Sequence, residues 1–422
     1  METKSTVPQG SCPFRLGGDG RSNAEEAALL RDVGPASEVE LPGGMRARAV
    51  VDYPLAQRLL RSGAVSRSAY LHCPGFADGT RQVDGVTRNW IGTRNALNSY
   101  GAAHTRLRAP IAAALNRRRI ESMVPAIEAL ADALLSKIAA DSACIVDARS
   151  DYAQPLPAQV NANLLGIPAD LQDPFFLASA GLFDTSASPV DAAAHMAAVV
   201  ELLDQLVEEK RAHPADDLTS DLIRICDESA SAFSDVELRD QLMLLVSAGT
   251  ETTVNSIGNL LVGLMANPEQ LHLVQTGKVG LEEALEESLR HQSPIANVPL
   301  RFAVERIQDA PTGEEFTEGQ PILVNFAAAG RDPAVHGPDA DSFDITRATS
   351  RQHLAFGHGT HFCPGAPLAR RETLIAVRKW LERFPSSSLA TPEPEVQRLR
   401  SIISNGYAVI PIRRGPRHTW TL

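Results

Sequence analysis

The sequence has few cysteines, and their spacing indicates neither disulfides nor a zinc site. Its 422 residues include five cysteines, an odd number, and no two of them stand at the Cys-x-x-Cys spacing of metal sites. They occupy positions 12, 73, 144, 226 and 363. We therefore expect no disulfide framework and no structural zinc, and only the surroundings of Cys363 point to chemistry.

The sequence also lacks an excess of positive charge and any long uninterrupted apolar run. Its 40 basic and 51 acidic residues give a net charge of -11, which argues against a nucleic-acid partner. No apolar stretch reaches the roughly 20 clean residues of a membrane span. The first residues, Met1 to Ser5, lack the basic-then-apolar order of a signal peptide. We expect a soluble, cytoplasmic protein without a membrane partner.

Apolar residues are plentiful and follow mostly helical spacing. They make up 44% of the chain, which is enough for a large core. Residues 1–25 are polar and rich in Gly and Ser, so we expect a loose N-terminal arm. No linker divides residues 26–422, which are predicted to form one domain. The fold class that this balance predicts is mainly α with a small β region.

Periodicity places the predicted elements along the chain. Apolar residues at helical spacing predict helices at about 54–62, 104–119, 121–140, 153–165, 190–212, 217–230, 234–267 and 366–384. Alternation predicts a hairpin over 39–51, and strand-like pieces occupy 299–326 and 397–412. Residues 64–100 read as irregular, and so long a loop inside a compact domain is usually functional.

Cys363 lies in a loop with an unusual composition. Phe356 precedes it by seven residues, and an amphipathic segment, 366–384, follows it. The loop glycines are Gly357, Gly359 and Gly365. Glycines let the backbone approach a large flat ligand, and a helix that starts just past a cysteine favours its thiolate. Thiolate is one of the ligands that makes haem iron cleave O–O bonds. A buried structural cysteine is the alternative reading of this residue alone.

The longest predicted helix has a weak point in its middle. It starts with a capping box at Ser234 and is interrupted by a run of Gly and Thr that lowers helix propensity. The hydroxyl of Thr252 can bond the carbonyl of Ala248, four residues earlier, and loosen the turn. With Glu251 beside it, this groove suits bound dioxygen and the relay of protons from water. An ordinary helix that packs closely at Ala and Gly is an equally good reading.

Two pairs of charged or polar residues share helix faces. Glu287 and Arg290 stand three residues apart, and His104 and Arg108 stand four apart. Each pair taken alone is more often an ordinary surface feature.

These motifs together resemble the cytochrome P-450 family. The spacing Phe-x-x-Gly-x-His-x-Cys-x-Gly around Cys363 resembles that family's haem-ligand loop, and the segment 248–253 resembles its Ala-Gly-x-(Asp/Glu)-Thr-Thr motif. The Glu-x-x-Arg pair and the later segments 331–333 and 343–347 follow the family's order. The family often has Asn before Arg-Asp-Pro, whereas this chain has Gly330. The resemblance covers about residues 100 to 385.

The resemblance implies a fold and a cofactor. The family's fold is a triangular, mostly helical domain with a small β region, and it holds haem b (iron protoporphyrin IX) between the long helix and the cysteine loop. By that match Cys363 is the axial thiolate ligand. Glu251 and Thr252, with Ala248, take the role of acid, alcohol and groove residue in O₂ activation.

The resemblance also assigns supporting residues. The remaining expected cofactor contacts, several of them to the haem propionates, are His104, Arg108, Arg301, Phe356, Gly359, His361 and Gly365. A structural network that fixes the cysteine loop is expected from Glu287, Arg290 and Arg347, since bidentate Arg–carboxylate pairs are stiff.

The implied activity is that of a bacterial-type haem-thiolate monooxygenase of specialised metabolism. It would use O₂ and electrons from NAD(P)H, delivered by a ferredoxin reductase and a ferredoxin because this chain has no flavin or iron–sulfur motif. The substrate would be an apolar or aromatic natural-product intermediate, undergoing hydroxylation, epoxidation or oxidative coupling. A peroxide-driven haem enzyme of the same fold and a non-catalytic haem-binding protein are the alternatives.

The expected substrate pocket is mainly apolar, like most small-molecule sites. Its predicted lining comprises Trp90, Leu244, Leu245, Ile295, Asn297, Val298, Ile402 and Ile403. Acidic substrates are not favoured, because no arginine falls among these residues.

Basic residues flank the side of the chain expected to meet a redox partner. They are Arg117, Arg118, Arg119, Arg370, Arg371, Arg378 and Lys379. They suit an acidic ferredoxin, and ordinary solvated helix faces explain them equally well.

Overall fold

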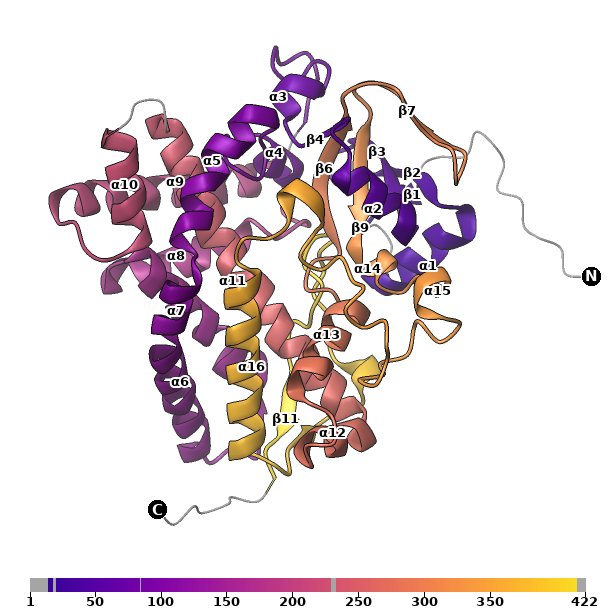
Figure 1. Ribbon diagram of the computed structural model, residues 1–422. Coiled ribbons are helices and arrows are strands. Elements are labelled where there is room, and N and C mark those ends of the chain that lie inside the picture. Colours follow the sequence, from indigo (N-terminus) through magenta and orange to yellow (C-terminus); the bar gives the residue numbers. More distant parts are fainter. Residues whose placement is uncertain (1–13, 18–19, 84, 229–232, 416–422) are drawn as a thin grey trace, which may run out of the picture.

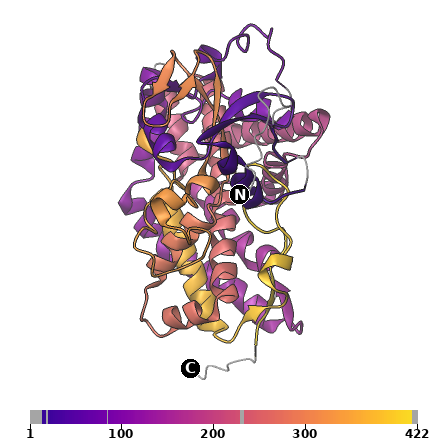
Figure 2. The same cartoon turned by 90° about the vertical axis from the view of Figure 1, so that its right-hand side faces the viewer.

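A computed structural model describes residues 14–17, 20–83, 85–228 and 233–415. Figure 1 shows a broad, mostly helical body with the long helices on one side and most of the strands on the other. The same molecule is narrower when it is turned by 90° (Figure 2). The expected mainly α fold with a small β region is confirmed.

The described residues contain sixteen α-helices (Figure 1). They are α1 (Asn23–Val33), α2 (Tyr53–Arg61), α3 (Ala69–His72), α4 (Gly85–Ile91), α5 (Gly101–Ala114), α6 (Arg117–Ala140), α7 (Pro155–Leu165), α8 (Ala169–Gly181), α9 (Pro189–Ala212), α10 (Leu218–Glu228), α11 (Asp235–Ala266), α12 (Pro268–Gln275), α13 (Leu281–His291), α14 (Phe326–Ala329), α15 (Pro333–His336) and α16 (Ala366–Arg383). A π-helical turn, η1 (Arg149–Ala153), precedes α7.

The predicted long helices are all present, within a few residues of their expected ends. Two departures stand out. The region 64–100 contains α3 and α4 as well as irregular backbone. Helix α8 carries apolar residues around much of its circumference and a proline inside it, so it shows no helical periodicity in the sequence.

The strands form one larger sheet and two small ones. The six-stranded sheet has the order β1 (Phe14–Arg15), β2 (Ala36–Glu40), β3 (Arg46–Val50), β9 (Pro321–Asn325), β6 (Asn297–Ala303) and β4 (Val65–Ser66). The three-stranded sheet has the order β10 (Ser388–Leu389), β11 (Pro411–Arg413) and β5 (Ile145–Asp147), and β7 (Ile307–Asp309) pairs with β8 (Glu314–Phe316). The predicted hairpin is β2–β3, paired antiparallel with Val39 opposite Ala47.

Ordered structure starts earlier than the predicted arm allows. Residues 1–13 lie outside the described residues. Phe14 pairs with Val39 in the parallel β1–β2 ladder, and Leu16 is buried. Helix α1 then begins after Ser22 with a capping box. The prediction of a loose arm is therefore wrong for the described residues up to 25, because a strand of two residues leaves no periodic pattern to detect.

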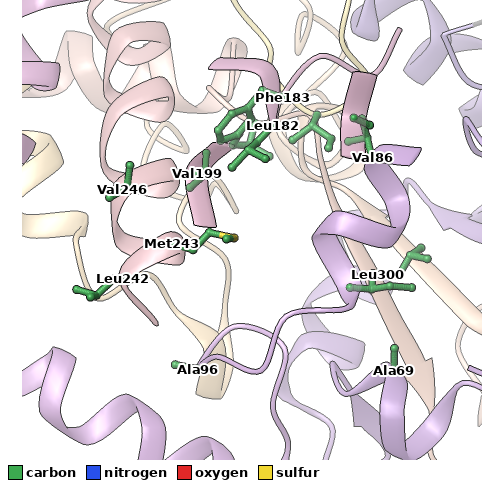
Figure 3. Close-up of a cluster of buried hydrophobic side chains, with 14 of the residues drawn as sticks. Ala69, Val86, Ala96, Leu182, Phe183, Val199, Leu242, Met243, Val246 and Leu300 are labelled. Atoms are coloured by element: carbon green, nitrogen blue, oxygen red, sulfur yellow. The ribbon is translucent and has the colours of Figure 1, made fainter. Parts of the chain in front are cut away.

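Helix α11 is the central element of the fold. Its 32 residues span about 48 Å, and the predicted capping box at Ser234 is present. Figure 3 shows part of the larger apolar cluster, where Met243 and Val246 of α11 gather with Val199 of α9 and with Phe183. A second cluster joins the C-terminal half of α11 to α6, α13 and α16. The long helix is thus held by buried apolar contacts on several sides.

Helix α7 approaches α11 at Gly249. A Cβ at this position would lie 2.7 Å from Oδ1 of Asn161, so only glycine fits. Asn161 Nδ2 donates hydrogen bonds to the carbonyls of Leu245 and Val246, at 3.2 and 3.0 Å. The side chain therefore ties α7 to the turn of α11 that precedes the Gly-Thr run.

The predicted Glu-x-x-Arg pair lies in the interior rather than at the surface. Arg290 Nε and Nη2 each donate to the Glu287 carboxylate at 2.7 Å, and both side chains are fully buried. Arg347 Nε lies 3.6 Å from the same carboxylate. Arg290 also donates to the carbonyls of Gly330 and Ala340 at 2.7 Å. The structure thus brings together the three residues expected to form a network.

Gly330 replaces the asparagine expected before Arg331, and the structure supplies the reason. A Cβ at Gly330 would lie 2.1 Å from the carbonyl oxygen of Arg290. Arg331 Nε donates to the carbonyl of His291 at 2.8 Å, so this segment packs directly on the end of α13. The backbone contact requires glycine at this position.

We expect Glu287→Ala to lower the free energy of unfolding by about 3–5 kcal/mol, because it leaves Arg290 buried without its anion. Urea unfolding measures this change. Glu283→Ala on the same helix is the matched control. Glu283 is half exposed, and its single ion pair, with Arg351, is long at 3.8 Å. Equal effects of the two substitutions would contradict the buried network.

Candidate active site

A cavity of about 270 Å³ lies between α11 and the loop that precedes α16. Cys363 and Phe356 of the loop line one side, and Ala248 and Thr252 of α11 line another. Residues from α5 and β6 contribute the remaining walls, including Arg108 and Arg301. The cysteine loop, the α11 groove and two predicted cations therefore meet at one cavity.

The cysteine loop depends on its glycines for its shape. Gly357 and Gly359 have φ angles of 73° and 70°, in the left-handed region. A Cβ at Gly359 would lie 2.4 Å from the carbonyl oxygen of Leu60, so the loop packs directly on the end of α2. The N–H of Cys363 donates to the carbonyl of Phe356 at 2.8 Å and closes the loop.

Opposing effects act on the thiol of Cys363. Burial raises its pKa, whereas hydrogen bonds from the amides of Gly365 and Ala366 and the charge of Arg108 lower it. Ala366 is the first residue of α16, so the helix N-terminus does point at the sulfur. Pro364 has no N–H to offer. A metal cation at the sulfur would supply the stabilisation that burial removes from the thiolate.

A second charged cluster braces the cysteine loop from outside the cavity. Glu286 accepts hydrogen bonds from His353 Nε2 at 2.9 Å and from Arg370 Nε at 2.6 Å. The Arg370 guanidinium lies 4.3 Å from the centre of the Phe356 ring. Burial raises the pKa of Glu286, but the hydrogen bonds from His353 and Arg370 outweigh it and bring the pKa to about 2.

Four predicted cofactor contacts gather at one end of the cavity. His361, Arg108 and Arg301 line the cavity, and the ring of His104 lies 4.1 Å from that of His361 without lining the cavity. Burial lowers the pKa of Arg301 to about 10, and burial with nearby arginines lowers the pKa of His361 to about 2. Within the described part of the chain, Arg301 Nη1 and His104 Nε2 are buried and have no hydrogen-bond partner.

These unsatisfied donors test whether haem fits the site. Buried polar groups normally have hydrogen-bond partners, so a ligand with acceptor oxygens suits this end of the cavity. Haem carries two carboxylates and an iron that binds thiolate. The buried donors of Arg301 and His104 and the cavity-facing sulfur of Cys363 match both requirements, and the residues present fit the group.

In α11 the predicted Thr252 hydrogen bond is present, but the carboxylate of Glu251 points away from the cavity. Thr252 Oγ1 donates to the Ala248 carbonyl at 2.8 Å, as expected. Glu251 does not line the cavity. Both of its oxygens accept from Arg149 Nη2 at 3.1 Å, and Asn255 Nδ2 donates to one of them at 3.1 Å. The structure therefore places the alcohol in the cavity and the acid on another side of the helix.

The structure brings five of the eight residues predicted for the substrate pocket to the cavity. The cavity is lined by Trp90, Leu244, Leu245, Ile295 and Val298. Asn297, Ile402 and Ile403 are buried but do not line it, so their assignment was wrong. Side chains alternate along a strand, so Asn297 turns away from the cavity and donates to the Ile402 carbonyl at 2.6 Å.

Several polar residues of the cavity wall were not predicted, and three of them stand out. Arg67 follows β4 in the region read as irregular, where no motif marks it. Asn161 stands at a buried position of α7. Glu372 lies on the buried face of α16, and burial raises its pKa well above the usual range. For Glu372 the sequence did offer a signal, because an acid stands there on an otherwise apolar helix face.

Most of the basic residues considered for partner docking have acidic neighbours. Helix α16 is joined to α6 by the ion pairs Arg371–Glu121 at 2.9 Å, Arg378–Glu128 at 2.7 Å and Lys379–Asp132 at 2.8 Å. Arg119 pairs with Asp221, and Arg370 pairs with Glu286. Ion pairs within the chain therefore account for these five residues without a docking partner.

Among the described helices, none has the length and apolar content needed to cross a membrane. The same residues contain no cluster of three His, Cys, Asp or Glu side chains that would hold a metal ion.

Comparisons with known proteins agree with this geometry. A family model described as "Cytochrome P450" matches residues 182–276 and 281–406. The chain is 36% identical over 402 residues to the 2-hydroxy-5-methyl-1-naphthoate 7-hydroxylase of Streptomyces carzinostaticus, an alignment that covers 95% of this chain and 97% of that relative. It is 34% identical to the cytochrome P450 monooxygenase PikC of Streptomyces venezuelae, over 92% of this chain and 89% of PikC. The solved structure of CYP154A1 from Streptomyces coelicolor A3(2) has a TM-score of 0.89 and 40% identity, and covers 95% of this chain and 99% of its own.

We expect the ion pairs of Glu286 with His353 and Arg370 to make the free energy of unfolding depend on pH. Its pKa is about 2 in the folded protein against 4.5 in the unfolded reference, so the stabilisation is full above about pH 4.5 and is lost as pH falls towards 2. Glu286→Gln should therefore be less stable than the wild type at neutral pH, with a gap that narrows on acidification. Urea midpoints over this range measure the gap, and a gap independent of pH would contradict the assignment.

Proposed function

The chain belongs to the cytochrome P450 family, and we propose that it hydroxylates or otherwise oxidises an apolar or aromatic natural-product intermediate, with electrons from NAD(P)H passed through a ferredoxin reductase and a ferredoxin. Members of the family are haem-containing monooxygenases with a cysteine thiolate as axial ligand. We assign that ligand to Cys363. The observation that carries the assignment is that the Cys363 sulfur shares one cavity with Arg301, whose Nη1 is buried without a hydrogen-bond partner among the described residues.

The haem, when bound, supplies reductive activation of O₂ and transfer of one oxygen atom to the substrate. The protein's part begins with holding that group. His104, Arg108, Arg301 and His361 are proposed to bind its carboxylates, and the short contact of Gly359 with α2 keeps the cysteine loop in place. Phe356 supports the loop through its contact with Arg370.

Proton delivery is assigned to α11. Thr252 lines the cavity, and its hydroxyl donates to the Ala248 carbonyl, so its oxygen can accept a hydrogen bond at the wall of the groove. Its proton becomes available there when the bond to Ala248 opens. Glu251 lies next to Thr252 in the chain and is 15% exposed. We assign to Glu251 the exchange of protons between water and Thr252. Its carboxylate is held by Arg149 and Asn255 and must leave one of these contacts to do so.

The cavity favours an apolar substrate. Trp90, Leu244, Leu245 and Val298 contribute apolar surface, and Trp90 is fixed by a hydrogen bond from Nε1 to the Leu182 carbonyl at 2.9 Å. The relative from Streptomyces carzinostaticus is named as a hydroxylase of a naphthoate. A fused aromatic substrate is consistent with the rigid aromatic wall in this chain.

Support for an acidic ferredoxin comes from a smaller surface than the sequence indicated. Arg117 and Arg118 are exposed at the start of α6. Phe362, directly before Cys363, is 44% exposed. An exposed aromatic residue beside the thiolate is a suitable contact for an electron donor.

The absorption spectrum of the dithionite-reduced, CO-bound protein is the first test. A Soret band at the red-shifted position of haem-thiolate proteins supports Cys363 as ligand, and Cys363→Ser should abolish it. A band typical of a neutral axial ligand would favour the haem-binding alternative instead.

Turnover with ferredoxin, reductase and NAD(P)H is then compared with turnover supported by hydrogen peroxide alone. Faster turnover with the reductase system supports the proposal. Turnover that depends only on peroxide would favour the peroxide-driven alternative.

We expect Thr252→Ala to lower the product formed per NAD(P)H by on the order of tenfold or more, because a proton donor is lost from the groove. Product yield and released peroxide, measured against NAD(P)H consumption, report this uncoupling. Thr250→Ala is the matched control, because Thr250 contacts Asn161 and does not line the cavity. Full coupling in Thr252→Ala would show that the assigned role is mistaken.

A further inference from the structure

Several hydroxyl groups of α11 donate hydrogen bonds to backbone carbonyls of the same helix. Each hydroxyl donates to the carbonyl four residues earlier in the chain. The pairs are Ser247 with Met243 at 2.8 Å, Thr250 with Val246 at 3.4 Å, Thr252 with Ala248 at 2.8 Å and Thr253 with Gly249 at 3.4 Å. Bonds of this kind compete with the N–H groups of the helix and favour a bend. Because they are spread over about three turns, they do not by themselves decide at which turn the helix opens.

Asn161 adds hydrogen bonds from a different helix to this stretch. The other buried residues of α7 are apolar, so a buried amide in this face needs a specific partner. Its Nδ2 donates to the carbonyls of Leu245 and Val246, at 3.2 and 3.0 Å, and to the hydroxyl of Thr250 at 3.2 Å. All of these acceptors lie on α11. The amide therefore selects one turn of the long helix.

Gly249 restricts how the Asn161 amide can lie. A Cβ at position 249 would lie 2.7 Å from Oδ1 and 2.9 Å from Cγ of Asn161, so the amide packs directly on the backbone of α11. Turning the amide over would point its oxygen at the carbonyl oxygens of Leu245 and Val246, which would replace both hydrogen bonds by repulsion. These contacts together hold the amide in one orientation at the wall of the cavity, which Asn161 and Gly249 both line.

The carbonyls bound by Asn161 are those that close the helical turn at Gly249. In an α-helix each carbonyl accepts from the N–H four residues later, so Leu245 and Val246 serve Gly249 and Thr250. A carbonyl oxygen has two lone pairs and can accept a second hydrogen bond. A side chain that enters this ladder draws the carbonyl outwards and weakens the bond within the helix. The backbone at Gly249 is thereby eased towards α7.

We propose that Asn161 is a positioning residue for Thr252, on which it acts through this eased turn of α11. The proposal rests on the proposed function, in which Thr252 handles a proton at the cavity wall. The carbonyl of Ala248, which accepts from the Thr252 hydroxyl at 2.8 Å, belongs to the same turn. Without the bonds from α7 the turn closes towards a regular helix, and this carbonyl moves away from the place where the hydroxyl meets it. Asn161 thus sets the direction of the hydroxyl without chemistry of its own.

The first experiment replaces Asn161 by leucine in the holoenzyme, which removes both carbonyl bonds at similar side-chain volume. We expect the product formed per NAD(P)H to fall roughly fivefold, the change to which one net hydrogen bond corresponds, with a rise in released peroxide. Asn163→Leu is the matched control on the same helix, because Asn163 is exposed and its side chain contacts Gln159. Asn161→Ala, which adds no apolar bulk, is measured beside it and should give the same result if the leucine variant does not retain haem.

The second experiment separates a positioning role from a purely structural one. If Asn161 acts through Thr252, the double variant Asn161→Leu/Thr252→Ala should be no more uncoupled than Thr252→Ala alone. Thr250→Ala keeps both carbonyl bonds of Asn161, so it should stay fully coupled. Urea unfolding of each holoprotein reports stability separately, and a purely structural role predicts lower stability with unchanged coupling.

The outcomes distinguish this proposal from the proposed function. Uncoupling in Asn161→Leu that is absent from Asn163→Leu and is not additive with Thr252→Ala supports the positioning role. Unchanged coupling in both Asn161 variants, or additive effects in the double variant, overturns that role whatever the change in stability. Full coupling in Thr252→Ala itself, or a wild-type protein without the haem-thiolate spectrum, would instead overturn the proposed function.

Discussion

The fold depends on the way in which adjacent acids of α13 are neutralised. Glu287 turns into the interior, where Arg290 and the segment 330–347 enclose it without water. Glu286 turns towards the cysteine loop, where His353 and Arg370 bind it. A buried carboxylate that loses its partner costs several kcal/mol, so each acid holds its surroundings in a single arrangement. The helix thereby connects the packing of the interior to the position of Cys363.

Whereas the acids of α13 have cationic partners within the protein, the cations Arg108 and Arg301 that line the cavity have no carboxylate bound to them among the described residues. Where Arg108, Arg301 and His361 line the cavity, the protein supplies positive charge and donors, and among the described residues Arg301 Nη1 is buried without a hydrogen-bond partner. Such an arrangement is unfavourable in the protein alone, and a bound anion stabilises it by mass action. The sulfur of Cys363 is in a similar position, because burial disfavours its charged form until a cation binds. Cofactor binding and stability are therefore coupled at both sides of the cavity.

Local chemistry made part of the site predictable. The cysteine loop was found because glycines and a following helix act within ten residues, and the Thr252–Ala248 bond was found because it spans one helical turn. The hairpin of β2 and β3 was found for the same reason. Arg67 was missed because no motif marks it and only the fold brings it to the cavity. Asn297 was assigned to the pocket wrongly, because a strand's pattern does not say which of its faces meets a cavity.

The sequence by itself determined the helical fold class and the cysteine loop, since these follow from spacing along one or two turns. Only the tertiary structure decided which charges are neutralised and which are left facing the cavity. It paired the cations of α16 with acids of α6 and turned Glu251 towards Arg149. The reason is physical: the energy of a charge depends on its burial and on partners distant in sequence, which no local pattern encodes.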